Sequence, residues 1–154
     1  MRLALCALAL VILCAACGQQ ASSAPAARPS PSRAVFGTAT LSETACNVDM
    51  PSQMPMGVVR FRLVNETRYS GHFILGNIHE GHTFQELLDY WNGPMGQVQQ
   101  PSFASEVEFM DVSAGKSDEM VALVSVAGVY AFHCGYLSPD TGKVIGFWHE
   151  LKAG

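Results

Sequence analysis

The feature that most constrains the fold is a series of short segments in which apolar and polar residues alternate. In GVVRFRLVN, residues 57–65, Val59, Phe61 and Leu63 fall on one face and two arginines on the other. This alternation is typical of a strand that buries one face. Similar segments recur between Gly-rich or polar turns, and about seven short strands of this kind predict an all-β sandwich or barrel. The expected strands are 34–42, 57–65, 70–76, 107–112, 119–126, 129–134 and 144–151.

One segment has a different pattern and predicts a single short helix between strands. Thr83 opens TFQELLDYW, and Glu86 follows at the spacing of a capping box. Apolar residues then recur at helical spacing, at Phe84, Leu87, Leu88 and Trp91. We therefore expect one helix inserted into an otherwise all-β domain.

The N-terminus indicates the compartment. Arg2 precedes an uncharged apolar run, 3–16, that is too short to span a bilayer and has the form of a secretory signal. The residues around Cys17 resemble a bacterial lipobox, in which the peptide is cut before a cysteine that is then lipidated. We expect a lipoprotein signal peptide at 1–16 and a lipid on Cys17; a plain signal peptide cut after a nearby alanine is the alternative. The first interpretation places the protein in the bacterial cell envelope, lipid-anchored and extracytoplasmic, on the periplasmic or outer surface.

The remaining chain divides into a linker and one domain. Residues 17–33 are rich in Ala, Ser and Pro and predict a flexible tether, because they cannot bury enough apolar surface to fold. Residues 34–154 are long enough for one domain with its own core. Removing Arg2 leaves 9 − 1 = 8 basic residues against 13 acidic ones, a net charge of −5. Since no basic patch is present, we expect no nucleic-acid partner, and the membrane contact is expected through the lipid.

Several motifs resemble the cupredoxin family, small Greek-key β-sandwiches that often hold a blue copper ion. The resemblance covers roughly residues 35–152, and its most specific parts are Asn65 with His72 and the pattern Gly-x-Tyr-x-Phe-x-Cys that ends at Cys134. In this family the corresponding histidine is the first copper ligand and the cysteine is the thiolate ligand. The resemblance therefore implies a cupredoxin-like Greek-key β-sandwich, copper as a cofactor, and ligand roles for His72 and Cys134.

The loop after Cys134 departs from the family pattern. A type 1 copper site needs two histidines and a cysteine, with a weak axial methionine. The family places the second histidine and the methionine in this loop, but residues 135–148 contain no histidine and Phe147 stands in place of the methionine. An ordinary blue copper centre is therefore not expected. His149 shares a strand face with Phe147, so it is either a substitute metal ligand near Cys134 or a core histidine with a hydrogen-bond partner.

Cys134 also has a competing interpretation. Once Cys17 is lipidated, Cys46 and Cys134 are the pair that remains in an oxidising compartment, and both a disulfide and free thiols are consistent with the sequence. Strand alternation turns Cys134 inward with the aromatic residues before it and turns His133 to the outer face. Adjacent strand residues cannot form a Cys–His nucleophile pair, and no other catalytic motif is present, so we expect no enzymatic activity.

Two further groups of residues are candidate metal ligands. His79 and His82 form an H-x-x-H pair ahead of the helix, although loop histidines are also common without a metal. Met50, Met54 and Met56 lie in a Pro-containing segment. Thioethers are soft ligands that suit Cu(I), whereas Met also fills irregular gaps in a core.

Two hypotheses of function follow. In the first, a membrane-anchored extracytoplasmic cupredoxin-like protein binds or handles copper through a non-standard site drawn from His72, Cys134 and His149. In the second, the domain is a metal-free structural or protein-interaction module stabilised by a Cys46–Cys134 disulfide. The expected partners are the membrane, through the lipid, and either a copper ion or a periplasmic partner protein.

Overall fold

A computed structural model describes residues 34–94 and 99–154 of the chain. The expected signal peptide at 1–16, the lipidation site Cys17 and the tether up to residue 33 lie outside the described residues. The described residues form one compact unit. Within them, no helix is both long enough and apolar enough to cross a membrane.

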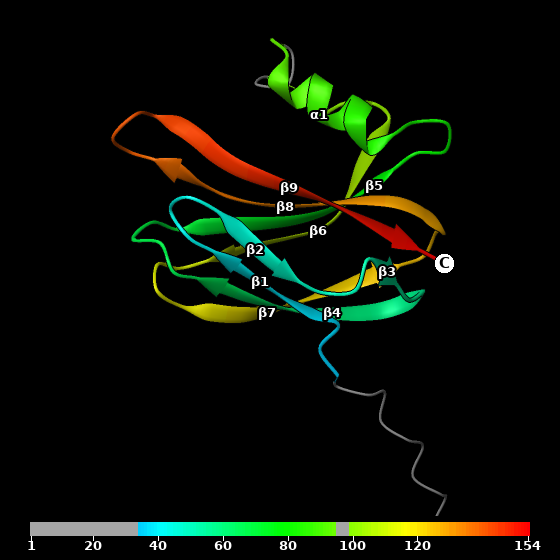
Figure 1. The fold of residues 1–154 in the computed structure, drawn as a ribbon, viewed down its shortest axis with the longest axis horizontal. Coiled ribbons are helices and arrows are strands. Elements are labelled where there is room, and N and C mark those ends of the chain that lie inside the picture. The colour runs from blue at the N-terminus through cyan, green and yellow to red at the C-terminus, as the bar shows by residue number, and fades with distance from the viewer. Residues whose placement is uncertain (1–33, 95–98) are drawn as a thin grey trace, which may run out of the picture. The chain divides into compact units, whose positions relative to one another are not determined.

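The described residues form nine strands in two sheets, together with one helix (Figure 1). One sheet has the strand order β2-β1-β4-β7, and the other has the order β3-β9-β8-β5-β6. Two pairs, β1 with β4 and β3 with β9, are parallel, and the other pairs are antiparallel. The elements are β1 (Gly37–Leu41), β2 (Cys46–Asp49), β3 (Gln53–Met54), β4 (Gly57–Asn65), β5 (Gly71–Ile78), α1 (Phe84–Asn92), β6 (Ala104–Val112), β7 (Ser117–Val124), β8 (Gly128–Ser138) and β9 (Lys143–Ala153).

The two sheets pack face to face with the main hydrophobic core between them, which confirms the predicted cupredoxin-like β-sandwich. The alternation in β4 buries Val59, Phe61 and Leu63 on its inner face. Phe61 meets Phe132 of the opposite sheet with ring centroids 5.6 Å apart. Among the described residues, the buried members of this core come from positions 39–153, so this part of the chain has a core of its own.

The prediction of about seven strands missed two short ones, β2 and β3. Both are edge strands, since β2 pairs with β1 and β3 pairs with β9. They lie in the segment 45–56, which contains prolines and has no regular alternation. Their backbone pairing with a neighbouring strand, rather than a local pattern of side chains, makes them strands. The hairpin of β8 and β9 also runs further than expected, to Ser138 and from Lys143.

Helix α1 begins where the sequence predicted, because Thr83 caps its first turn. The backbone N–H of Glu86 donates to the Thr83 hydroxyl, and the backbone N–H of Thr83 donates to the Glu86 carboxylate. Leu87 is buried with Ile78 and Ala131 in a second, smaller apolar cluster. The helix therefore covers part of the outer face of the five-stranded sheet, the face turned away from the main core (Figure 1).

Candidate functional site

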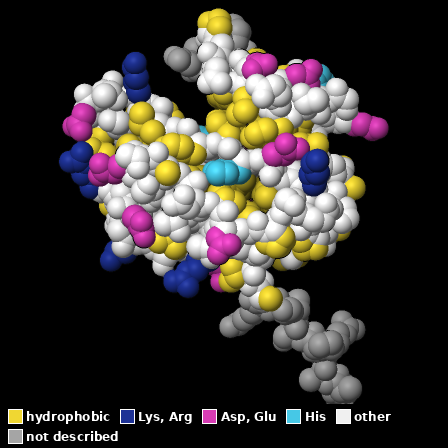
Figure 2. Space-filling view, in the orientation of Figure 1, with side chains coloured by type: hydrophobic (Ala, Val, Ile, Leu, Met, Phe, Trp, Pro, Cys, Tyr) yellow, Lys and Arg dark blue, Asp and Glu magenta, His cyan; other side chains and the backbone are white. Residues whose placement is uncertain are grey.

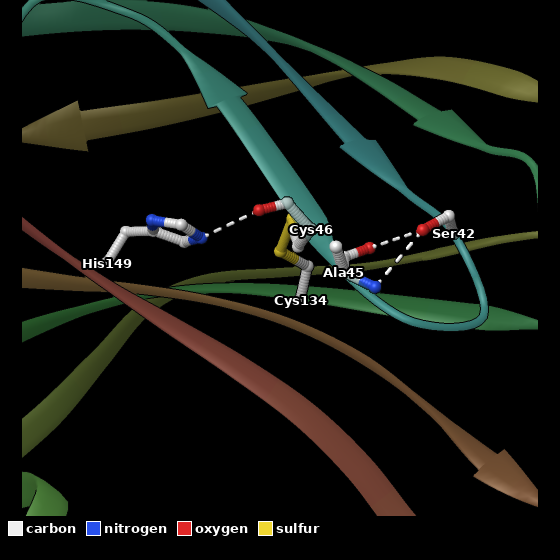
Figure 3. Close-up of a disulfide and its surroundings, with 5 residues drawn as sticks. All are labelled: Ser42, Ala45, Cys46, Cys134 and His149. Atoms are coloured by element: carbon white, nitrogen blue, oxygen red, sulfur yellow. Dashed lines mark hydrogen bonds between the residues drawn. A yellow bond between two sulfur atoms is a disulfide. The ribbon is translucent and has the colours of Figure 1, made fainter.

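Cys46 and Cys134 form a disulfide that joins the two sheets (Figure 3). Cys46 begins β2 of the four-stranded sheet, and Cys134 lies in β8 of the five-stranded sheet. Their Cα atoms are 6.3 Å apart, within the range that a disulfide spans. Both side chains are buried in the main core. Of the alternatives that the sequence left open, the structure has the disulfide.

The register of β8 explains why Cys134 faces inward. Cys134 belongs to the main core with Tyr130 and Phe132, whereas Ala131 belongs to the smaller cluster under α1. This division between two clusters confirms the predicted alternation of β8. Phe147 lies directly opposite Cys134 on β9.

His149 lies beside the disulfide, as its shared strand face with Phe147 predicted. Its Nε2 atom is 3.0 Å from the carbonyl oxygen of Cys46, and Figure 3 shows this edge of the ring turned towards the bond between the sulfur atoms. A carbonyl can only accept, so Nε2 carries the proton in the neutral ring. Partial burial lowers the pKa of His149, and the hydrogen bond to the Cys46 carbonyl opposes that shift. His149 is thus a half-buried histidine with a hydrogen-bond partner.

The structure brings three metal-ligating side chains together at this point. The ligand atoms of Cys46, Cys134 and His149 all lie within 4.8 Å of one another. Among the described residues this is the one group of three His, Cys, Asp or Glu side chains at such distances. Cys46 is the member that strand patterns could not have placed, because it begins a strand that the sequence did not predict.

His72 does not join this group. In β5, His72 pairs with Gly135, and the next residue, Phe73, pairs with Cys134. Paired residues share a face and adjacent residues alternate, so His72 points to the outer face while Cys134 points to the core. The structure therefore does not unite His72, Cys134 and His149 in one ligand set. The reason is the register of β5 on β8, which the motif spacing alone does not reveal.

On the outer face, His72 and His133 stack with their ring centroids 5.1 Å apart. Trp148 covers His133 at 4.2 Å. Two glycines make room for these rings: a Cβ at Gly146 would overlap Nε2 of His133, and one at Gly135 would lie 2.9 Å from Nε2 of His72. The predicted direction of His133 is therefore correct, but it is buried rather than exposed, because this face of the sheet is covered.

Burial decides the charge of the two outer-face histidines. Desolvation, with a smaller contribution from His72, lowers the pKa of His133 to about 3, so this ring is neutral at physiological pH. Its Nδ1 atom has no hydrogen-bond partner among residues 34–94 and 99–154. Desolvation also lowers the pKa of His72, against the attraction of Asp111 on the neighbouring strand.

The other candidate ligands have separate positions. His79 is 2.7 Å from the Ser105 hydroxyl through Nε2, and His82 stacks on Phe103 with its centroid 4.6 Å away. Met54 is fully buried in the main core and Met50 packs against that core, whereas Met56 is 45% exposed. The ligand group at the disulfide includes neither His79 nor His82.

The residues present do not fit a type 1 copper centre. The sulfur of Cys134 is bonded to another sulfur, so it is not the thiolate that such a centre requires. The loop after Cys134 offers no histidine, and Phe147, which lies opposite Cys134 on β9, has no ligand atom.

Comparison with known proteins gives structural similarities only. No protein-family model matches the chain, and no curated protein sequence matches it. The reduced auracyanin of the photosynthetic bacterium Roseiflexus castenholzii is 12% identical over 76% of this chain and 94% of its own, with a TM-score of 0.46. Auracyanin A, a "blue" copper protein of Chloroflexus aurantiacus, is 14% identical over 76% and 96%, with a TM-score of 0.46. A multicopper oxidase is 12% identical over 77% of this chain and 42% of its own, with a TM-score of 0.40. These similarities assign no role to any residue of this chain.

Proposed function

From the cupredoxin-like fold of the chain, we propose an extracytoplasmic, lipid-anchored protein that binds Cu(I) through Cys46, Cys134 and His149 once their disulfide is reduced. The observation that supports this proposal is the convergence of the three ligand atoms within 4.8 Å. Two thiolates and one imidazole form a soft donor set, which suits Cu(I) better than the hard cations. The anchor is proposed from the sequence around Cys17.

The disulfide makes this site dependent on redox state. A dithiol reductant would supply two electrons and two protons, cleave the bond between the sulfur atoms and leave two thiols, while the reductant itself becomes a disulfide. Metal binding then displaces the two thiol protons. In the oxidised form neither sulfur is a thiolate, so the oxidised protein should hold no copper at this site.

His149 must rearrange before it can bind a metal. Its protonated Nε2 lies against the Cys46 carbonyl and beside the sulfurs. Ligation through Nε2 requires this atom to leave the carbonyl and the proton to move to Nδ1. Burial favours the neutral form of the ring. His149 therefore needs only this change of tautomer, and not the loss of a proton to solvent, before Nε2 can bind the metal.

A second function is favoured by the burial of the bond itself. Cys134 is 0% exposed and Cys46 is 5% exposed, which restricts attack by an external thiolate. A disulfide that stays intact would make the domain a metal-free module, with a structural or protein-interaction role. The two functions differ in whether the folded domain can be reduced.

Thiol counting and Cu(I) titration of the soluble chain from residue 18 onward separate the two functions. The copper-binding function predicts no free thiol before reduction, two after it, and one Cu(I) per reduced chain in competition with a Cu(I) chelator. His149→Ala should weaken this binding by about tenfold or more, since it removes one of three strong ligands. His72→Ala is the matched control, because it removes a histidine from the opposite face of the same sheet.

A folded, reduced protein that takes up no Cu(I) would rule out the copper-binding function. Resistance of the disulfide to reduction in the folded domain would favour the metal-free module. Equal losses in His149→Ala and His72→Ala would mean that copper binds elsewhere.

A further inference from the structure

A cavity of about 120 Å³ lies between helix α1 and the outer face of the five-stranded sheet. Gly76 and Ala131 are small lining residues on this face of the sheet, and Leu87 of the helix lines the cavity from above. Figure 2 shows hydrophobic side chains along the edge of α1 where it meets the sheet. The cavity lies on the opposite face of β8 from Cys134, so it is separate from the disulfide group.

Two tryptophans line this cavity, Trp91 from α1 and Trp148 from β9. Their rings are stacked, with centroids 5.7 Å apart and planes at 25°. The chain contains two tryptophans in total, so both are at this one site. The two indole rings add apolar aromatic surface to the lining, which favours a ligand with an apolar ring.

The cavity also has an unsatisfied hydrogen-bond donor. The indole Nε1 of Trp91 is buried and has no acceptor among residues 34–94 and 99–154. A buried indole N–H normally finds a partner, so an unpaired one beside a cavity indicates that an acceptor is missing from the site. The acidic group in the lining is Glu106, which is exposed and disfavours an anionic ligand.

We propose that this cavity binds a small neutral molecule with a single aromatic or heteroaromatic ring and a carbonyl oxygen that accepts the hydrogen bond of Trp91. The cavity is somewhat smaller than the enclosed apolar cavity of about 150 Å³ that binds benzene, and it is partly open, so it holds no more than one ring. The aromatic and aliphatic lining takes the ring, and the N–H of Trp91 selects the carbonyl. This binding does not involve the disulfide, so it is independent of copper.

Acetophenone and ethylbenzene are matched probes for this site, because they differ mainly in the carbonyl oxygen. The soluble chain from residue 18, with its disulfide intact, would be titrated with each probe. The two indole N–H signals would be followed by ¹H–¹⁵N NMR. We expect acetophenone to move the signal of Trp91 downfield and ethylbenzene not to. In Trp91→Phe, which keeps a ring but removes the donor, the preference for acetophenone over ethylbenzene should fall by about 3- to 10-fold. This preference is measured as the ratio of the two dissociation constants.

Tyr130→Phe is the control, since it removes a hydrogen-bond donor from the other face of β8, outside the cavity, and it should leave the ratio unchanged. Ala104→Leu narrows the cavity while keeping Trp91, and it should weaken both probes. An unchanged ratio in Trp91→Phe would overturn the role of the N–H. Absence of binding of either probe at millimolar concentration would mean that the cavity holds water only, and would overturn the site. Two results overturn the proposal even if Trp91→Phe does not fold. One is the absence of the downfield shift of Trp91 in the wild-type protein, and the other is unweakened binding of the probes in Ala104→Leu.

Discussion

Removing the Cys46–Cys134 disulfide should lower the free energy of unfolding by about 4–5 kcal/mol. The two cysteines are 88 residues apart in the sequence. The loop-entropy relation then gives about 15 cal/mol/K, or about 4.6 kcal/mol at 25 °C, as the effect of the cross-link on the unfolded chain. Since small domains are stable by only about 5–15 kcal/mol in total, the reduced domain should be close to the limit of folding.

Urea denaturation, followed by tryptophan fluorescence, measures this loss. Three samples are needed: the oxidised protein, the same protein with a phosphine reductant, and the double variant Cys46→Ala, Cys134→Ala. The reduced protein keeps both sulfur atoms in the core, so it isolates the cross-link, and the double variant adds the loss of packing. The slope with urea should also rise, because the unfolded chain expands without the bond. A loss below about 1 kcal/mol in the reduced protein would refute the loop-entropy reasoning.

The remaining predictions concern the two faces of β8. Phe132→Ala should lower the free energy of unfolding by about 3–5 kcal/mol, because the side chain is fully buried against Phe61 and Phe73; a loss below about 1 kcal/mol in a urea titration would contradict its place in the core. The pKa of His133 is about 3 in the fold against 6.5 in the unfolded chain, so the unfolded chain takes up this proton first as the pH falls. Its contribution to stability is therefore complete above pH 6.5 and is lost between there and about pH 3. The free energy of unfolding of the wild-type protein should differ between pH 7 and pH 4.5, and His133→Leu should reduce this difference by about 2–3 kcal/mol. Equal pH dependence in both proteins would show that His133 is not a buried, neutral side chain.

The sequence predicted the positions of residues that belong to a local pattern, such as strand alternation or a capping box. The alternation of β4 and β8 predicted which side chains face the core, and the capping box at Thr83 predicted where α1 begins. The strands β2 and β3 were missed because their pairing comes from neighbours that are distant in the sequence. His72 shows the same limit at the site: its type fits a ligand, but its face depends on the register of β5 against β8.

The sequence by itself determined the fold class, the inward direction of Cys134 and the absence of the loop ligands of a blue copper site. These follow from alternation, turn residues and residue identity, which are local properties of the chain. Only the tertiary structure decided that Cys46 reaches Cys134, that His149 joins them and that His133 is buried under Trp148. Each of these depends on the distance between segments far apart in the sequence, which is fixed by how the two sheets pack and by how strands align within a sheet.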